Sequence, residues 1–193
     1  ARHRLQNVDE LKTLATYLLS NIGSIASYSK LASVAGISSR SLVGKYIDMF
    51  LQSFLFHEVK KFDYSVKKQL LNPRKLYASD IGFSREVGFN FSENSGHILE
   101  NIVFLHISEE TFYHRQDYEC DFVIKQGLKV VEAIQVCYNL NDENRKREIA
   151  GLVEACKTHK LKKGLLLTYD QEDSFVEDGV TITVQPVWKW LLE

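Results

Sequence analysis

The sequence predicts an α/β (α+β) protein in which a helix-turn-helix segment precedes a second part built around a mixed β-sheet. Helical periodicity dominates residues 8–52, whereas alternation of apolar and polar residues, typical of strands, dominates the middle of the chain. The charge also changes sign: residues 1–85 contain 13 Lys and Arg against 6 Asp and Glu, and residues 86–193 contain 11 against 19. We therefore expect two modules, 1–85 and 86–193, unless the charges only form two solvated surfaces.

Three helices are predicted in the first module. They cover residues 8–21, 27–35 and about 39–52. Gly36 lies in the tight turn between the second and third helices, and Ser38 or Ser39 is placed to cap the third. This order is the helix-turn-helix pattern, in which the later helix can enter a DNA groove. Helix-turn-helix folds also bind proteins, so the pattern leaves the partner open.

A wing is predicted after the third helix, formed by a strand at residues 54–62 and a second strand that begins with the segment 70–78. The outward face of the third helix and the basic segment that follows form the candidate nucleic-acid surface: Arg40, Ser41, Lys45, Lys60, Lys61, Lys67 and Lys68. In one interpretation these side chains contact the phosphates of duplex DNA. In the other, the lysines protect an exposed sheet edge from aggregation.

The second module is organised around a predicted β-hairpin at residues 118–137, closed by a Gly-bearing turn at 125–129. Its apolar positions suit a buried sheet, where an unpaired carboxylate is costly. Asp121 lies among these apolar residues, and we expect it to belong to a functional site. Glu119 and Glu132 fit equally well on the exposed face of a half-buried sheet.

The order of elements predicted for the second module is αβββαβ. It comprises a helix at 96–107, strands at 111–115, 118–124 and 128–136, a helix at 142–159 and a strand at 164–169. Because a helical crossover precedes the last strand, we expect it to pair in parallel with one strand of the 111–136 meander. A further strand at 180–185 and a helical turn at 187–192 are expected to extend and cover the sheet.

This order, with Glu100 in an apolar helix and Asp121 on the second strand, resembles the PD-(D/E)XK nuclease superfamily, in which an acidic pair holds Mg²⁺ and a lysine assists the attacking water. The resemblance makes Glu100, Asp121 and Gln135 the hypothetical metal ligands. The third-strand Glu-x-Lys signature falls on Gln135 and Cys137, an amide and a thiol that supply no charge. An alternative register uses Glu132, which would then face Asp121 across the hairpin. Neither register supplies the lysine, so the site is interpreted as degenerate unless a lysine from another element, for example Lys125, Lys129 or Lys146, replaces it.

Several longer motifs extend along the whole chain. They are ARHRLQN, YLLSNIGS, SYSKLAS, NPRKLYASDIGF, GHILENIVFLHI, YECDFVI and AIQVCYNLNDENRKREIAGL. Together they resemble the C-terminal region of prokaryotic P-loop ATPases of the "archaeal ATPase" type, which join an AAA-like motor to a winged helix and a nuclease-like domain. The resemblance implies a C-terminal fragment that partners the ATPase module of the same protein, with ATP bound only in that absent N-terminal module.

Functions from different classes remain open. The favoured hypothesis is a DNA-interaction or partner-interaction module with a degenerate, inactive nuclease-like site and no cofactor in this fragment. The first alternative is a DNA nuclease that depends on a divalent metal such as Mg²⁺. The second alternative is a protein-binding module that binds no nucleic acid.

The composition predicts a soluble, cytoplasmic protein without a membrane partner. No apolar run approaches the length of a membrane span, and residues 1–10 lack the apolar segment of a signal peptide. Cys120, Cys137 and Cys156 are odd in number and widely spaced, so we expect reduced, buried thiols rather than disulfides or a zinc site.

Overall fold

The computed structural model describes residues 7–87 and 95–193. The elements of the first stretch are α1 Val8–Ser20, β1 Ile25–Ala26, α2 Tyr28–Ala35, α3 Arg40–Gln52, β2 Phe56–Lys61, α4 Val66–Leu71, β3 Arg74–Ala78 and α5 Ile81–Val87. Those of the second stretch are α6 Ser95–His106, β4 Glu110–Arg115, β5 Glu119–Gln126, β6 Lys129–Val136, α7 Arg145–His159, β7 Lys163–Thr168, β8 Asp173–Glu177, β9 Val180–Pro186 and α8 Val187–Trp190. The protein is therefore an α/β protein with N-terminal helices, as the sequence predicts.

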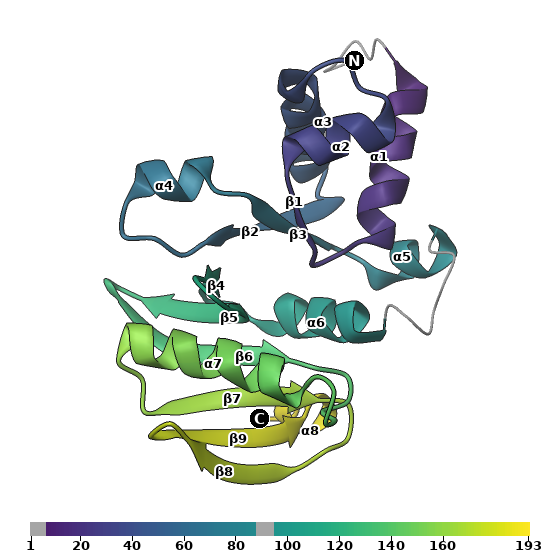
Figure 1. Cartoon of the computed structure of the whole chain (residues 1–193). Coiled ribbons are helices and arrows are strands. Elements are labelled where there is room, and N and C mark those ends of the chain that lie inside the picture. Colours follow the sequence, from purple (N-terminus) through teal and green to yellow (C-terminus); the bar gives the residue numbers. More distant parts are fainter. Residues whose placement is uncertain (1–6, 88–94) are drawn as a thin grey trace.

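A single mixed sheet connects the two stretches (Figure 1). Within the described residues it has nine strands in the order β1-β3-β2-β4-β5-β6-β7-β9-β8. Strand β2 joins the first stretch to the second by pairing in parallel with β4, at Lys60 with Phe112 and Lys61 with Tyr113. The sheet thus crosses the expected junction at residue 86, and the part of that junction at residues 88–94 lies outside the described residues.

The three N-terminal helices form where the apolar periodicity places them. Ser27 and Ser39 cap α2 and α3 by accepting hydrogen bonds from backbone N–H groups of the first turn, and Gly36 ends α2 in the left-handed conformation. Their apolar faces enclose one core, which includes Leu14, Leu31 and Ile47. This packing buries Val43 and Ile47 of α3 and leaves Arg40, Ser41 and Lys45 exposed.

The segment between β2 and β3 differs from the prediction. Residues 70 and 71 belong to the short helix α4, and the second strand begins only at Arg74. Ser65 caps this helix, which ends at Leu71. Its C-cap Asn72 is extended, because the residue before a proline disfavours helical geometry. Lys67 and Lys68 are therefore helical residues, and Figure 1 shows α4 apart from the α1–α3 bundle.

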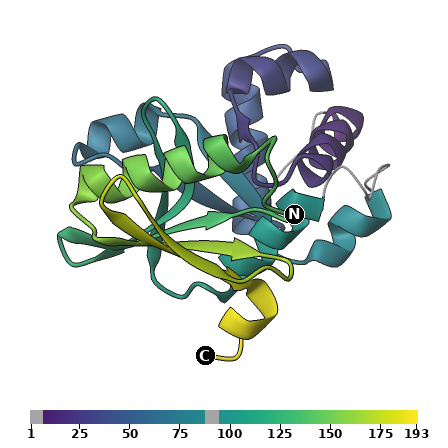
Figure 2. The ribbon, with the colours of Figure 1, turned by 60° about the horizontal axis from the view of Figure 1, so that its bottom comes forward.

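The second stretch follows the predicted αβββαβ order from α6 to β7. Strand β7 pairs in parallel with β6, which confirms the expected crossover through α7. Strand β9 lies parallel to β7, and the unpredicted β8 forms the edge of the sheet. Helix α7 lies along one face of the sheet (Figure 2).

Both faces of the central hairpin are buried, so it is not a half-exposed sheet. Cys120 and Val123 pack in the same cluster as α7 residues, whereas Phe122 and Ile124 pack with α6 residues on the other face. Gly127 forms the turn with a φ of 61°. The three cysteines are buried and unpaired, as predicted.

No helix among the described residues has the length and apolar character that crossing a membrane requires.

Candidate functional site

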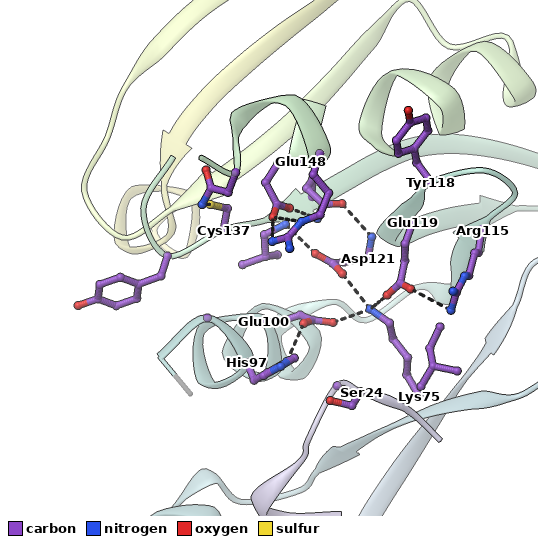
Figure 3. Close-up of a pocket in the computed structure, with 18 of the residues that line it drawn as sticks. Ser24, Lys75, His97, Glu100, Arg115, Tyr118, Glu119, Asp121, Cys137 and Glu148 are labelled. Carbon is purple, nitrogen blue, oxygen red and sulfur yellow. Dashed lines mark hydrogen bonds and ion pairs between the residues drawn. The ribbon is translucent and has the colours of Figure 1, made fainter. Parts of the chain in front are cut away.

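A cleft of about 950 Å³ opens between the N-terminal part and the central sheet (Figure 3). Its wall includes Gly23 and Ser24 from the α1–β1 turn and Lys75 from β3. The remaining wall comes from α6, from the β4–β5 loop and β5, and from the end of β6 and the first turn of α7. The cleft therefore has contributions from both stretches of the chain.

Three carboxylates meet in this cleft around one ammonium group. The Lys75 Nζ lies 2.9 Å from Glu100 Oε1, 2.8 Å from Glu119 Oε1 and 2.8 Å from Asp121 Oδ1. The ammonium donates hydrogen bonds to Glu100 and Asp121, and its ion pair with Glu119 completes the cluster. The Lys75 side chain is 2% exposed, and this pairing compensates a charge that would otherwise be very costly to bury.

The remaining carboxylate oxygens also have partners. Glu100 Oε1 accepts a second hydrogen bond, of 2.6 Å, from the Tyr77 hydroxyl, and His97 Nδ1 lies 3.6 Å from Glu100 Oε2. The backbone N–H of Val136 donates to Asp121 Oδ2 at 3.0 Å. Arg115 lies 3.6 Å from Glu119 Oε2. Each of the six oxygens therefore faces a donor or a cation from the protein itself.

The three groups respond differently to burial. Burial alone would lower the pKa of Lys75, but Asp121 and Glu100 outweigh it and raise that pKa well above its ordinary value. Burial likewise opposes ionisation of Glu100, yet Lys75 and hydrogen bonds make its net pKa lower than usual. Burial, and then repulsion from Glu100, raise the pKa of Asp121 to about 7. Of Glu100 and Asp121, it is therefore Asp121 that takes up a proton first as the pH falls.

A series of hydrogen bonds connects the backbone of Asp121 with side chains of α7. Gln135 Oε1 accepts the backbone N–H of Asp121 at 3.2 Å, and Gln135 Nε2 donates to Glu148 Oε2 at 2.7 Å. Arg147 donates in turn to Glu148 Oε1. Cys137 lines the cleft, where burial, followed by Glu148, raises the pKa of its thiol to about 11. This thiol therefore stays protonated at neutral pH.

The structure brings together part of the predicted metal set. Glu100 and Asp121 converge on Lys75, but the oxygen of Gln135 is bonded to the backbone of Asp121 instead of facing them. Glu132 lies opposite Ile124, so the alternative register in which it faces Asp121 is wrong. Among residues 7–87 and 95–193, no group of three or more His, Cys, Asp or Glu side chains is arranged to hold a metal ion. Because Lys75 stands between the carboxylates, this arrangement does not fit Mg²⁺.

The predicted nucleic-acid residues lie on three separate elements. Arg40, Ser41 and Lys45 are exposed on α3, and Lys67 and Lys68 are exposed on α4. The other two, Lys60 and Lys61, are half-buried on β2, and Lys60 forms an ion pair with Glu58. Helix α3 therefore presents three exposed residues of the predicted DNA-contacting set, and α4 presents two.

Lys75 is the central residue that sequence reasoning missed. It lies in the strand RKLYA, where Lys75 and Tyr77 share a face because strand side chains alternate. The signal that could have marked it is a lysine next to the apolar run of Leu76, Tyr77 and Ala78, but the neighbouring Arg74 weakens that signal. Its partners come from segments distant in the sequence, so no local pattern identifies them.

Comparison with known proteins relates the chain to larger proteins. Residues 1–93 match the model of a family described as a domain of unknown function (DUF8612). The chain is 34% identical, over 99% of its length, to the uncharacterized protein MJ1544 of Methanocaldococcus jannaschii, and 24% identical, over 95%, to an uncharacterized protein of Haemophilus influenzae. It covers 46% of each relative and so spans about half of their length. No solved structure matches it.

Proposed function

We propose that this chain is the C-terminal interaction region of a larger P-loop ATPase, that its helix-turn-helix docks on duplex DNA, and that its nuclease-like site is catalytically inactive. The observation that carries the inactive site is Lys75, whose ammonium bonds Glu100, Glu119 and Asp121 at once. A tethered cation thereby takes the position between carboxylates at which a nuclease of this type would hold its metal.

The element order supports the two fold assignments. The order from α1 to β3, with a two-stranded hairpin after the third helix, is that of a winged helix. The order from α6 to β7 is that of the PD-(D/E)XK core, with Glu100 on the helix and Asp121 on the second strand. The relatives are about twice as long as the chain, which leaves room for the ATPase module that the motifs imply.

The charge distribution supports docking through α3. Arg40 and Lys45 are exposed, while Tyr46 and Ile47 anchor the helix in the core. An exposed helix face with cations next to a buried anchor is what a recognition helix needs to reach phosphates and base edges. The acidic second half would be repelled by DNA, so we place the contact on the first half alone.

A metal-dependent nuclease is the second candidate, because Lys75 is also a basic residue in contact with Glu100 and Asp121, which is what the third-strand motif lacks. In that function a divalent cation would replace the Lys75 ammonium as the partner of the carboxylates, and Lys75 would lie next to the metal. The present contacts favour the inactive site, since all six carboxylate oxygens are already engaged.

Cleavage assays separate the two candidates. Wild-type protein, Asp121→Ala and the double variant Gln135→Glu, Cys137→Lys are incubated with linear, branched and single-stranded DNA in Mg²⁺ or Mn²⁺. We expect no cutting by the wild type. Metal-dependent cutting that Asp121→Ala abolishes would establish the nuclease instead.

Duplex binding is tested separately by fluorescence anisotropy across a salt series. Replacing Arg40 and Lys45 with alanine should weaken binding and reduce the salt slope by about 0.9 per lost phosphate contact. The matched control replaces Lys129 and Lys162, which are exposed on the second half, and should leave binding unchanged. Equal behaviour of both variants would remove α3 as the DNA site and favour a protein-binding module without nucleic acid.

A further inference from the structure

Two loops meet at one edge of the sheet, beside the cleft. Residues 138–144 follow β6 and residues 169–173 follow β7, and these strands are parallel neighbours. Parallel strands bring their carboxyl ends to the same edge, which is a common location for binding sites in α/β proteins. We call these two segments the rim. Tyr138 of the rim also lines the cleft.

The rim is tied together by backbone and side-chain hydrogen bonds. The Tyr169 N–H donates to the Tyr138 carbonyl at 3.1 Å. Gln171 accepts from the Leu140 N–H at 2.6 Å and donates to the Leu140 carbonyl at 3.0 Å. The Thr168 hydroxyl donates to the Gln171 carbonyl and accepts from the Gln171 N–H, which fixes the second loop. Because the bonds from Tyr169 and Gln171 cross to the first loop, the rim presents a preorganised surface, which lowers the entropic cost of binding.

Two tyrosines of the rim stack on each other and are exposed to solvent. The rings of Tyr138 and Tyr169 lie 4.8 Å apart at 20° to each other, and the two residues are 41% and 54% exposed. Exposed aromatic faces attract cations, most often the guanidinium of arginine, through the negative potential above the ring.

The rim also carries a concentrated negative charge. Its two segments contain five acidic residues and no lysine or arginine. Glu172 is paired with Lys189 at 2.7 Å. The carboxylates of Asp142, Glu143 and Asp170 make no hydrogen bond or ion pair with any described residue and are exposed. Three free carboxylates therefore share the loops with the two tyrosines.

We propose that the rim binds a basic segment of a protein partner, with arginine side chains placed over Tyr138 and Tyr169 and paired with Asp142, Glu143 and Asp170. Unpaired nucleobases also stack on tyrosine, but their phosphates would meet these carboxylates, so the charge favours a basic peptide. This surface is distinct from the DNA-docking face of α3 and borders the cleft of the Lys75 site at Tyr138. The proposal does not depend on either of those functions.

The test titrates the full chain with a Gly-Arg repeat peptide and follows backbone amide shifts by NMR. A Gly-citrulline repeat, which keeps the shape and lacks the charge, serves as the control peptide. We expect shifts centred on residues 138–144 and 169–173 with the arginine peptide alone. The double variant Tyr138→Ala, Tyr169→Ala should bind about tenfold more weakly, since each exposed cation–π contact contributes a few-fold. Replacing the exposed Tyr64, on the β2–α4 connection, should have no effect.

The carboxylates are tested with Asp142→Asn, Asp170→Asn, which should weaken binding and flatten its salt dependence. Glu177→Gln is the matched control, because Glu177 is exposed on β8 outside the rim. The proposal is overturned if the peptide does not bind at millimolar concentration, or if the shifts lie elsewhere. It is also overturned if single-stranded oligothymidine binds the same tyrosines more tightly than the peptide does.

Discussion

Replacing Lys75 with methionine removes the one cation that bonds all three carboxylates while keeping a similar length of side chain. Glu100 and Asp121 are then left buried without their shared partner. Removing one partner of a buried ion pair typically costs about 3–5 kcal/mol. This is a large part of the ~5–15 kcal/mol by which a folded domain is stable, so we expect a clear fall in the free energy of unfolding.

The loss should depend on pH in a defined direction. Without the ammonium, burial raises the pKa of Glu100 and Asp121 above their values in the unfolded chain. A carboxyl whose pKa is raised on folding stabilises the protein below its unfolded pKa, and this contribution disappears as the pH rises through the folded pKa. The deficit of Lys75→Met relative to wild type should therefore be larger at pH 8 than at pH 5.

Urea denaturation followed by circular dichroism measures both effects, with and without Mg²⁺. The variant should gain stability from Mg²⁺ by mass action, because its carboxylates lack a cation, whereas the wild type should not respond. Lys45→Met, at an exposed position of α3, is the matched control. If the variant does not fold, the double variant Lys75→Met, Asp121→Asn is used. It removes one buried negative charge together with the positive charge and should fold. A deficit below about 1 kcal/mol, within the range of an exposed ion pair, would refute the view that Lys75 is the counter-ion of the site.

Three further predictions concern single groups. A ¹³C-NMR titration should show the Asp121 carboxyl losing its proton near pH 7, and a midpoint below 5 would contradict the burial argument. Burial without a hydrogen-bond partner, and then His114, lower the pKa of His159 to about 4. Because the unfolded chain then binds this proton more readily, the protein should lose stability as the pH falls from about 6.5 to 4. Thermal melts of His159→Phe should no longer show this loss. Gly151→Ala should destabilise by about 1–3 kcal/mol or more in urea, because its Cβ would lie 1.9 Å from the Glu119 carbonyl oxygen, whereas Gly96→Ala, with nothing within 4 Å, should not.

The helices and most strands were predictable because their signals are local. Serine caps, Gly36 and the apolar stripe of residues 8–21 define α1–α3 without reference to the rest of the chain. The elements that were missed lack such signals. Strand β1 has two residues, and β8 is an exposed edge whose burial pattern shows no apolar face. Helix α4 has six residues and none of them is buried, so no apolar stripe marks it.

Only those site residues were predictable from the sequence that are charged within an otherwise apolar helix or strand. Glu100 in an apolar helix and Asp121 in an apolar strand were found in this way, and both lie in the cleft. The Lys75 pairing was not found, because Lys75 and Asp121 are 46 residues apart and belong to different halves. The fold-based expectation placed the missing cation on the third strand of the core, whereas the structure supplies it from β3.

The contact between Lys75 on β3 and Asp121 on β5 requires the sheet to curve. In the strand order β3-β2-β4-β5, three interstrand steps of a flat sheet would separate the two backbones by ~14 Å, farther than the two side chains extend together. Strands β2 and β4 pair at only two positions, so the sheet can curl there and bring β3 toward β5. The Lys75 Nζ also lies 5.9 Å from the centre of the Tyr113 ring on β4, between the two strands that it connects. The ion cluster and the curl therefore depend on each other: removing the ammonium should loosen the contact between the two halves as well as the site.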